Sequence, residues 1–124
     1  MKAVLFISHG SRSFKSSEEV QNLIGQLKNK SGVALFEYGF LEQQRPSIPE
    51  AIDTCVHKGA TEIFVLLNFL NSGKHVDEDV PRIVNTAHQR YPGLKFTLSQ
   101  PIGQHPKIGE LFLQTISEGL TNVP

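Results

Sequence analysis

The sequence has few of the features that mark several common classes of protein. A single cysteine, Cys55, excludes a disulfide within the chain, and its place on the apolar stripe of a predicted helix indicates a core residue. The 12 basic and 12 acidic side chains cancel, so no overall field favours nucleic acid or an anionic membrane. The apolar run that starts at Phe64 is too short for a membrane helix. These absences predict a cytoplasmic protein with no nucleic-acid or membrane partner.

The chain length predicts one domain over residues 1–124. A chain of 124 residues is close to the commonest single-domain size and can bury one ordinary core without disulfides. The first ten residues hold only a short apolar stretch, and no A-x-A-like cleavage site follows it. We therefore expect a core strand at the N-terminus rather than a signal peptide.

Strand and helix patterns alternate strictly along the chain. Compact β-rich runs occupy residues 3–7, 33–40, 63–67 and 94–98. Each run is followed by a segment with helical periodicity. This alternation predicts a single-domain α/β sandwich of three layers, with a four-stranded parallel sheet between helices on both faces. We expect the flavodoxin-like strand order 2-1-3-4.

Four helices are predicted from their end signals. Ser16 and Glu19 have the spacing of a capping box for the first helix, and Ser47 and Glu50 repeat it for the second. The third helix starts near Val80 and stops before the Tyr91-Pro92-Gly93 segment. His105-Pro106 opens the fourth helix, which we expect to pack inward through its apolar residues Ile108, Leu111, Phe112 and Ile116.

Each predicted strand is followed by an imidazole or a carboxylate. His9 follows the first strand, Glu42 the second, His75 the third and His105 the fourth. Because parallel strands end at one edge of the sheet, these side chains share that edge, where open α/β sheets bind ligands. With strands one and three as neighbours, His9 and His75 would flank the crevice. The other two histidines fall within helices and are expected at the surface.

This set of residue types suits a divalent metal that is held weakly. Two neutral imidazoles and a carboxylate are ligands for cobalt, iron or nickel, whereas a closed structural zinc site would need further cysteine or histidine ligands. Arg12 and Lys74 lie near the same edge, with the Ser11 hydroxyl beside them, and could meet the carboxylates of a polyanionic ligand. Loop histidines also cap helices and fix turns, so each residue taken alone has a structural alternative.

Other catalytic motifs are absent from the sequence. The segment ending in Gly73-Lys74 lacks the earlier glycine of a phosphate-binding P-loop, and His75 follows it instead of serine or threonine. No G-x-G-x-x-G is present, and neither Ser8 nor Ser11 lies in a G-x-S-x-G. Dinucleotide binding and serine hydrolysis are therefore disfavoured.

A series of short motifs resembles the sirohydrochlorin chelatase family, and most closely its short, single-domain CbiX type. The matching residues, in chain order, are Ser8-His9-Gly10-Ser11, Phe40-Leu41-Glu42, Pro46-Ser47-Ile48, Gly59-Ala60, Phe69-Leu70 with Gly73 and His75, Asp79-Val80-Pro81, and Pro101-Ile102-Gly103 with His105-Pro106. The resemblance spans nearly the whole chain. Asn68, where relatives often have proline, and Lys74 depart from the family pattern.

The resemblance implies a class II chelatase that inserts a divalent metal into sirohydrochlorin. The metal would be cobalt on a route to cobalamin, iron on a route to sirohaem, or nickel, and it would be a substrate rather than a permanently bound cofactor. The resemblance implies a homodimer as well, the form in which the short members of the family pair. The resemblance also implies that His9 and His75 handle the metal and accept protons and that Glu42 is a third ligand. We expect Ser11, Arg12, Gly73, Lys74 and His105 to bind the tetrapyrrole, with Arg12 and Lys74 as the cations that meet its carboxylates.

Two other functions stay open on the sequence. His9 could be the nucleophile of a phosphotransfer enzyme, although no arginine directly precedes it. The chain could also be a non-catalytic carrier of metal or tetrapyrrole. Which imidazole is the base and which is the ligand is not decided by the sequence.

Overall fold

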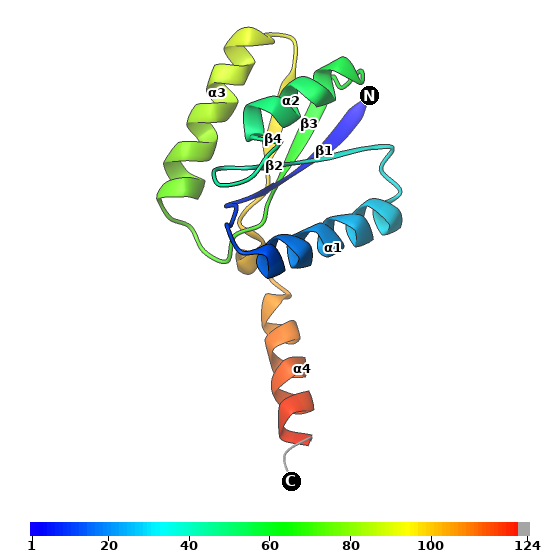
Figure 1. Ribbon diagram of the computed structural model, residues 1–124, viewed down its shortest axis with the longest axis vertical. Helices are drawn as coiled ribbons and strands as arrows, with labels where there is room; N and C mark the ends of the chain where they lie inside the picture. The colour runs from blue at the N-terminus through cyan, green and yellow to red at the C-terminus, as the bar shows by residue number, and fades with distance from the viewer. Residues whose placement is uncertain (122–124) are drawn as a thin grey trace.

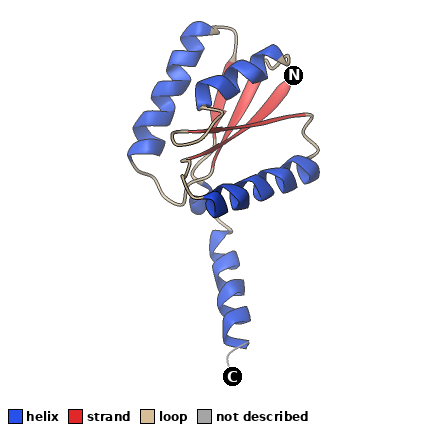
Figure 2. Ribbon diagram, in the orientation of Figure 1, coloured by secondary structure: helices blue, strands red, loops and turns tan. Residues whose placement is uncertain are grey.

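One parallel sheet organises the structure, a computed structural model that describes residues 1–121. Its strands are β1 (Lys2–Ser8), β2 (Leu35–Phe40), β3 (Glu62–Leu67) and β4 (Lys95–Leu98), in the order β2-β1-β3-β4 (Figures 1 and 2). Every neighbouring pair is parallel. The predicted fold class and strand order are confirmed, and β2 and β4 begin slightly later than the sequence pattern indicated.

Helices cover both faces of the sheet. On one face, α1 (Phe14–Ser31) packs Ile24 against Phe6 of β1 and Phe36 of β2. On the other face, α2 (Ile48–His57) and α3 (Val80–Arg90) close the main core (Figure 2). Cys55 is fully buried there, and burial raises the pKa of its thiol to about 11. The expectation that this cysteine is an inert core residue is consistent with that position.

The helix starts follow the sequence signals in one case and depart from them in another. Ser47 and Glu50 form the expected capping box, in which each side chain accepts a hydrogen bond from the other residue's backbone N–H. The first helix is different, because it starts at Phe14 and its cap is Ser13, whose hydroxyl accepts from the Ser16 backbone N–H. The predicted capping box of Ser16 and Glu19 is therefore wrong.

A π-helical turn, η1 (His75–Asp79), precedes α3. The sequence pattern placed the start of the helix near Val80 and left His75 in a loop. In the structure, His75 instead opens a helical segment that continues directly into α3. The wider π turn places the His75 and Asp79 side chains next to each other, at a spacing of four residues.

The last helix, α4 (Ile108–Thr121), departs most from the prediction. It follows a short 3-10 turn, η2 (Ile102–Gln104), and extends away from the sheet (Figure 1). None of its residues is buried, so the expected inward packing of Leu111, Phe112 and Ile116 is wrong. Within residues 1–121, no helix has the length and apolar character needed to cross a membrane.

Candidate functional site

The structure brings His9 and His75 into direct contact. His9 follows β1 and His75 opens η1 after β3, and these two strands are neighbours in the sheet. Their ring centroids lie 4.6 Å apart, with an angle of 82° between the ring planes. The His9 side chain is 43% exposed and that of His75 is 42% exposed, so both rings remain open to a ligand. The predicted meeting of these two residues is found in the structure.

Each imidazole also contacts a carboxylate. His9 Nε2 lies 2.6 Å from Glu42 Oε1, and His75 Nδ1 lies 2.7 Å from Asp79 Oδ2. The hydrogen bond from His75, together with the positive charge of Arg82, lowers the pKa of Asp79 below its usual value. An ionised Asp79 fixes a proton on His75 Nδ1 and leaves Nε2 of that ring available as a base or ligand.

Sequence reasoning missed Asp79 as a site residue. In the sequence, Asp79 stands out only as the first residue of the Asp79-Val80-Pro81 motif. The spacing of four residues between His75 and Asp79 was the available signal, because side chains four apart face one another on a helix. The spacing indicates a contact only if both residues lie on a helix, and the sequence pattern placed His75 in a loop.

A glycine lets the two loops that carry His9 and Glu42 approach closely. Gly10 has φ +101°, and a Cβ on it would lie 1.8 Å from the Glu42 carbonyl oxygen. Backbone hydrogen bonds join the loops, from Leu41 N to Ser8 O and from Glu42 N to His9 O, each 3.0 Å long. The position of the Glu42 carboxylate beside His9 therefore rests on this backbone contact.

A buried hydrogen bond between two polar side chains stabilises the same edge of the sheet. Ser8 is only 4% exposed, and its hydroxyl accepts a 2.9 Å hydrogen bond from Asn68 Nδ2. The Asn68 backbone N–H also donates to Ile7 O over 2.9 Å. Proline could make neither bond, so asparagine at this position ties the ends of β1 and β3 together in a way that proline would not.

The other predicted binding residues are more scattered. The backbone N–H of Ser11 donates to Gln44 Oε1 and the Arg12 side chain donates to Gln43 Oε1, over 2.8 and 2.6 Å. Gly73 and Lys74 directly precede His75 and are exposed. His105 is held by a turn, in which its Nδ1 accepts from Lys107 N, and it lines a separate groove beside Phe64. Among residues 1–121, no hydrogen bond, ion pair or ring contact joins His105 to the histidine pair.

The predicted metal ligands do not form a preorganised coordination shell. Among residues 1–121, no group of three or more histidine, cysteine, aspartate or glutamate side chains has the geometry of a metal site. The Glu42 carboxylate instead occupies Nε2 of His9 as a hydrogen-bond partner. A divalent metal that bound there would take the place of the shared proton, because imidazole must be neutral to coordinate.

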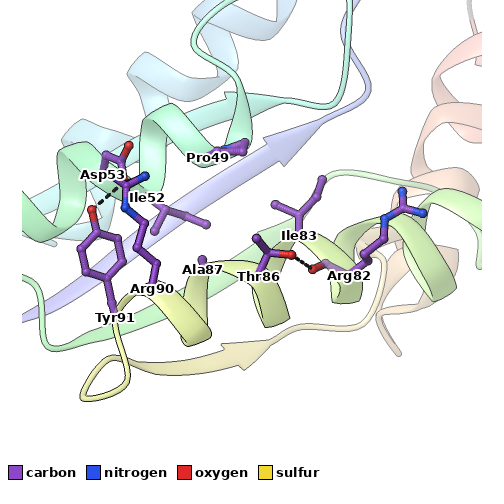
Figure 3. A pocket seen from close by; sticks show the side chains of 9 residues that line it. All are labelled: Pro49, Ile52, Asp53, Arg82, Ile83, Thr86, Ala87, Arg90 and Tyr91. Carbon is purple, nitrogen blue, oxygen red and sulfur yellow. Dashed lines mark hydrogen bonds and ion pairs between the residues drawn. The ribbon is translucent and has the colours of Figure 1, made fainter.

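Two cavities differ in their position relative to the histidine pair. One, of about 170 Å³, lies beside His9 and is lined by residues that include Ser8, Ser11, Gln44 and Asn68. The other, of about 240 Å³, lies between α2 and α3 and contains none of the predicted site residues (Figure 3). In it, Tyr91 donates to Asp53 and Arg90 pairs with the same carboxylate, so these polar groups already have partners.

The fold and the site together define a class of protein. This is an α/β protein with a flavodoxin-like strand order and a pair of imidazoles at the carboxyl edge of the sheet, where such folds bind their ligands. Residues 3–119 match the family model described as CbiX, and the chain therefore belongs to the CbiX family.

Named relatives agree with this membership. The chain is 33% identical to a sirohydrochlorin cobaltochelatase of Priestia megaterium, over 99% of this chain and 40% of that protein. It is 31% identical to a sirohydrochlorin cobaltochelatase of Saccharolobus solfataricus, over 95% of each chain. The structure of SirB from Bacillus subtilis with Fe3+ has a TM-score of 0.89 at 29% identity, over 99% of this chain and 48% of SirB. The chain thus spans less than half of the Priestia and Bacillus relatives.

Proposed function

We propose that this protein inserts a divalent metal, cobalt or iron, into sirohydrochlorin. The observation that carries the proposal is the contact between His9 and His75, each with its own carboxylate, at the open carboxyl edge of the sheet. The names of the relatives support the choice of substrate. Nickel fits the same donor types, since imidazole and carboxylate bind all three metals.

The reaction requires both a base and a transient metal site. Metal insertion exchanges one divalent cation for the two protons on the pyrrole nitrogens of the ring, so two protons must be accepted. An imidazole with an ordinary pKa of about 6.5 is a suitable acceptor near neutral pH. His9, His75 and Glu42 are the proposed metal ligands, and the two histidines are the proposed proton acceptors. Their exposure suits release of the metal to the ring, because a closed four-ligand shell would retain it.

The carboxylates of the tetrapyrrole require cationic and N–H partners. Arg12 lies three residues after His9, and Lys74 directly precedes His75. Both are exposed, which supports a role in binding these carboxylates. Ser11 and Gly73 offer a hydroxyl and an open backbone on the same two loops. His105 belongs to the proposal as a more distant contact, on the connection that leads to α4. No permanently bound cofactor is required.

We propose in addition that two copies of the chain pair and that the protein is cytoplasmic. Pairing is supported by the large apolar side chains that α4 exposes. The cytoplasmic location is supported by the free thiol of Cys55, since intracellular proteins commonly keep their cysteines reduced.

The test is the absorbance change of sirohydrochlorin on metallation, with Co2+ and Fe2+ in separate reactions. We expect His9→Ala and His75→Ala to remove the enzyme-dependent rate. His88→Ala is the matched control, because His88 is exposed on α3 and its loss should leave the rate unchanged. A wild-type rate in either site variant would refute the proposed mechanism.

Two further measurements, ligand binding and phosphatase activity, separate the two alternatives. A carrier would bind sirohydrochlorin or cobalt in a fixed ratio and leave the spontaneous metallation rate unchanged. A phosphotransfer enzyme would hydrolyse an aryl phosphate, and this activity would be lost in His9→Ala. Either result, in the absence of catalysed metallation, would replace the chelatase proposal.

A further inference from the structure

The Asp79 carboxylate contacts a different side chain with each of its two oxygens. Oδ2 lies 2.7 Å from His75 Nδ1, and Oδ1 accepts a 2.9 Å hydrogen bond from Arg82 Nη2. The Asp79 side chain is 14% exposed and that of Arg82 is 70% exposed. Arg82 is therefore the outermost of three side chains in a row that begins at the histidine pair and ends at the surface of α3.

The local sequence leaves the Asp79 carboxylate free for these two contacts. An aspartate directly before a helix commonly accepts a hydrogen bond from a backbone N–H of the first turn, but Asp79 makes no such bond. One reason is that η1 continues directly into α3, so that Val80 N already donates to His75 O. Another is that Pro81 has no N–H to donate. With His75 four residues before it and Arg82 three residues after it, Asp79 meets both on one face of the helical segment.

Arg82 restricts the orientation of the Asp79 carboxylate. Asp79 is largely removed from water, and the neighbouring Val80 is fully buried, so an oxygen without a donor would be unfavourable there. The bond from Arg82 satisfies Oδ1 while Oδ2 faces His75. Because the guanidinium is exposed, this ion pair contributes little to folding stability. Its effect is on the direction in which the carboxylate points.

We propose that Arg82 is a positioning residue that orients His75 through Asp79. With Arg82 in place, Asp79 holds the proton on His75 Nδ1, and Nε2 of the ring stays available for a metal or for a pyrrole proton. Without Arg82, the carboxylate can rotate away from the ring, and His75 exchanges between its two tautomers. The effect on turnover rests on the proposed chelatase function, whereas the state of the His75 ring can be measured without metal or sirohydrochlorin.

An exposed arginine near the site has one other use, which is direct binding of a carboxylate of the tetrapyrrole. The two roles predict different kinetics. Loss of a direct contact with the substrate raises KM, whereas loss of a positioning contact lowers kcat. A positioning role also requires Asp79, so the effect of replacing Arg82 should disappear when the Asp79 carboxylate has already been removed.

The first test is steady-state cobalt insertion by the full-length protein. We expect Arg82→Gln to lower kcat about threefold to tenfold with little change in KM, a smaller loss than for Asp79→Asn because Arg82 is one contact further from the ring. Arg82→Lys should recover most of the rate, since the contact uses a single charged donor. In the Asp79→Asn background, Arg82→Gln should lower kcat no further.

Arg90→Gln is the matched control for these variants. Arg90 lies at the opposite end of the same helix, is similarly exposed and pairs with Asp53, away from the histidine pair (Figure 3). Its replacement should leave kcat and KM unchanged. Because both arginines are exposed, the glutamine variants are expected to fold, and thermal unfolding checks this.

The second test observes the His75 ring in the protein without metal. Long-range proton–nitrogen NMR spectra show which ring nitrogen carries the proton, at a pH well above about 6.5, where an ordinary imidazole is neutral. His75→Ala identifies the signals of this ring. We expect the proton on Nδ1 in the wild type and in Arg90→Gln, and a larger share on Nε2 in Arg82→Gln and Asp79→Asn.

Three results would overturn the positioning role. They are a wild-type kcat in Arg82→Gln, an unchanged His75 tautomer in that variant, and an equal further loss of kcat when Arg82→Gln is added to Asp79→Asn. A rise in KM alone would assign Arg82 to direct binding of the tetrapyrrole instead. If the wild type did not catalyse metallation, the chelatase proposal would fail, and the tautomer comparison would still decide whether Arg82 orients His75.

Discussion

The imidazole rings of His9 and His75 meet edge to face, with their centroids 4.6 Å apart, although they belong to distant parts of the chain. The parallel pairing of β1 with β3 produces this contact, since both strands end at the same edge of the sheet. Each ring is also bonded to one carboxylate, Glu42 for His9 and Asp79 for His75. The two halves of the site can therefore be tested separately.

Asp79 is expected to act by positioning His75. Asp79→Asn keeps the size of the side chain but removes the negative charge that fixes the proton on His75 Nδ1. Loss of such an outer partner typically reduces activity or metal affinity by about 10–100-fold. We expect kcat for cobalt insertion to fall by about this factor, with a smaller change in KM for sirohydrochlorin.

The control for this change is Asp77→Asn. Asp77 is exposed on the same turn, and its replacement removes the same charge without touching His75. Equal kcat values for the wild type and Asp79→Asn would show that the His75–Asp79 contact has no part in turnover.

Glu42 is expected to contribute to metal binding through its contact with His9. In Glu42→Gln the amide retains a hydrogen bond to the ring but carries no charge to balance the metal. We expect the dissociation constant for Co2+, measured from its visible absorbance, to rise at least about tenfold. Glu19→Gln on α1 loses the same charge at an exposed position and should bind Co2+ as the wild type does.

The sheet and the histidine pair could be predicted from the sequence because buried strands leave strong patterns. Apolar runs bounded by turn residues indicated the four strands, and their alternation with helices implied one parallel sheet. Once the strand order is given, His9 and His75 must approach, since they follow neighbouring strands. The Ser47–Glu50 capping box was equally predictable, because it depends only on local spacing.

The remaining features depend on contacts that no local pattern encodes. The pairing of Asp79 with His75 requires the π turn, and the bond between Asn68 and Ser8 requires the ends of β3 and β1 to meet. The apolar residues of α4 recur at helical spacing, but this spacing does not say whether they pack against the same chain. The prediction assigned the helix to its own sheet, whereas in the structure it extends away from the sheet and none of its residues is buried (Figure 1).

Gly10 is expected to be essential for the shape of the site. Alanine there would adopt a strained positive φ, and its Cβ would collide with the Glu42 carbonyl. We expect Gly10→Ala to lower the free energy of unfolding by at least about 1–3 kcal/mol in urea titrations. It should also weaken Co2+ binding, because the loop that carries Glu42 must move away from His9.

The matched control is Gly25→Ala in the middle of α1. A Cβ on Gly25 meets no atom within 4 Å. Alanine is favoured over glycine inside a helix, so this variant should gain about 0.5–1 kcal/mol. If Gly10→Ala were as stable as the wild type and bound Co2+ equally well, the close approach of the two loops would not be required.

The capping box of α2 predicts a dependence of stability on acid pH. Hydrogen bonds from Arg45 and from the Ser47 backbone lower the pKa of Glu50 from 4.5 to about 2. Because the pKa is lower in the folded state, the unfolded chain takes up the proton first as the pH falls. The stability that the Glu50 carboxylate contributes is therefore complete above about pH 4.5 and disappears as the pH approaches 2. We expect Glu50→Gln to unfold at a lower urea concentration than the wild type at pH 6, and the two midpoints to converge between pH 4.5 and about 2. A difference in midpoint that stayed constant over this range would mean that the charge of Glu50 does not stabilise the start of α2.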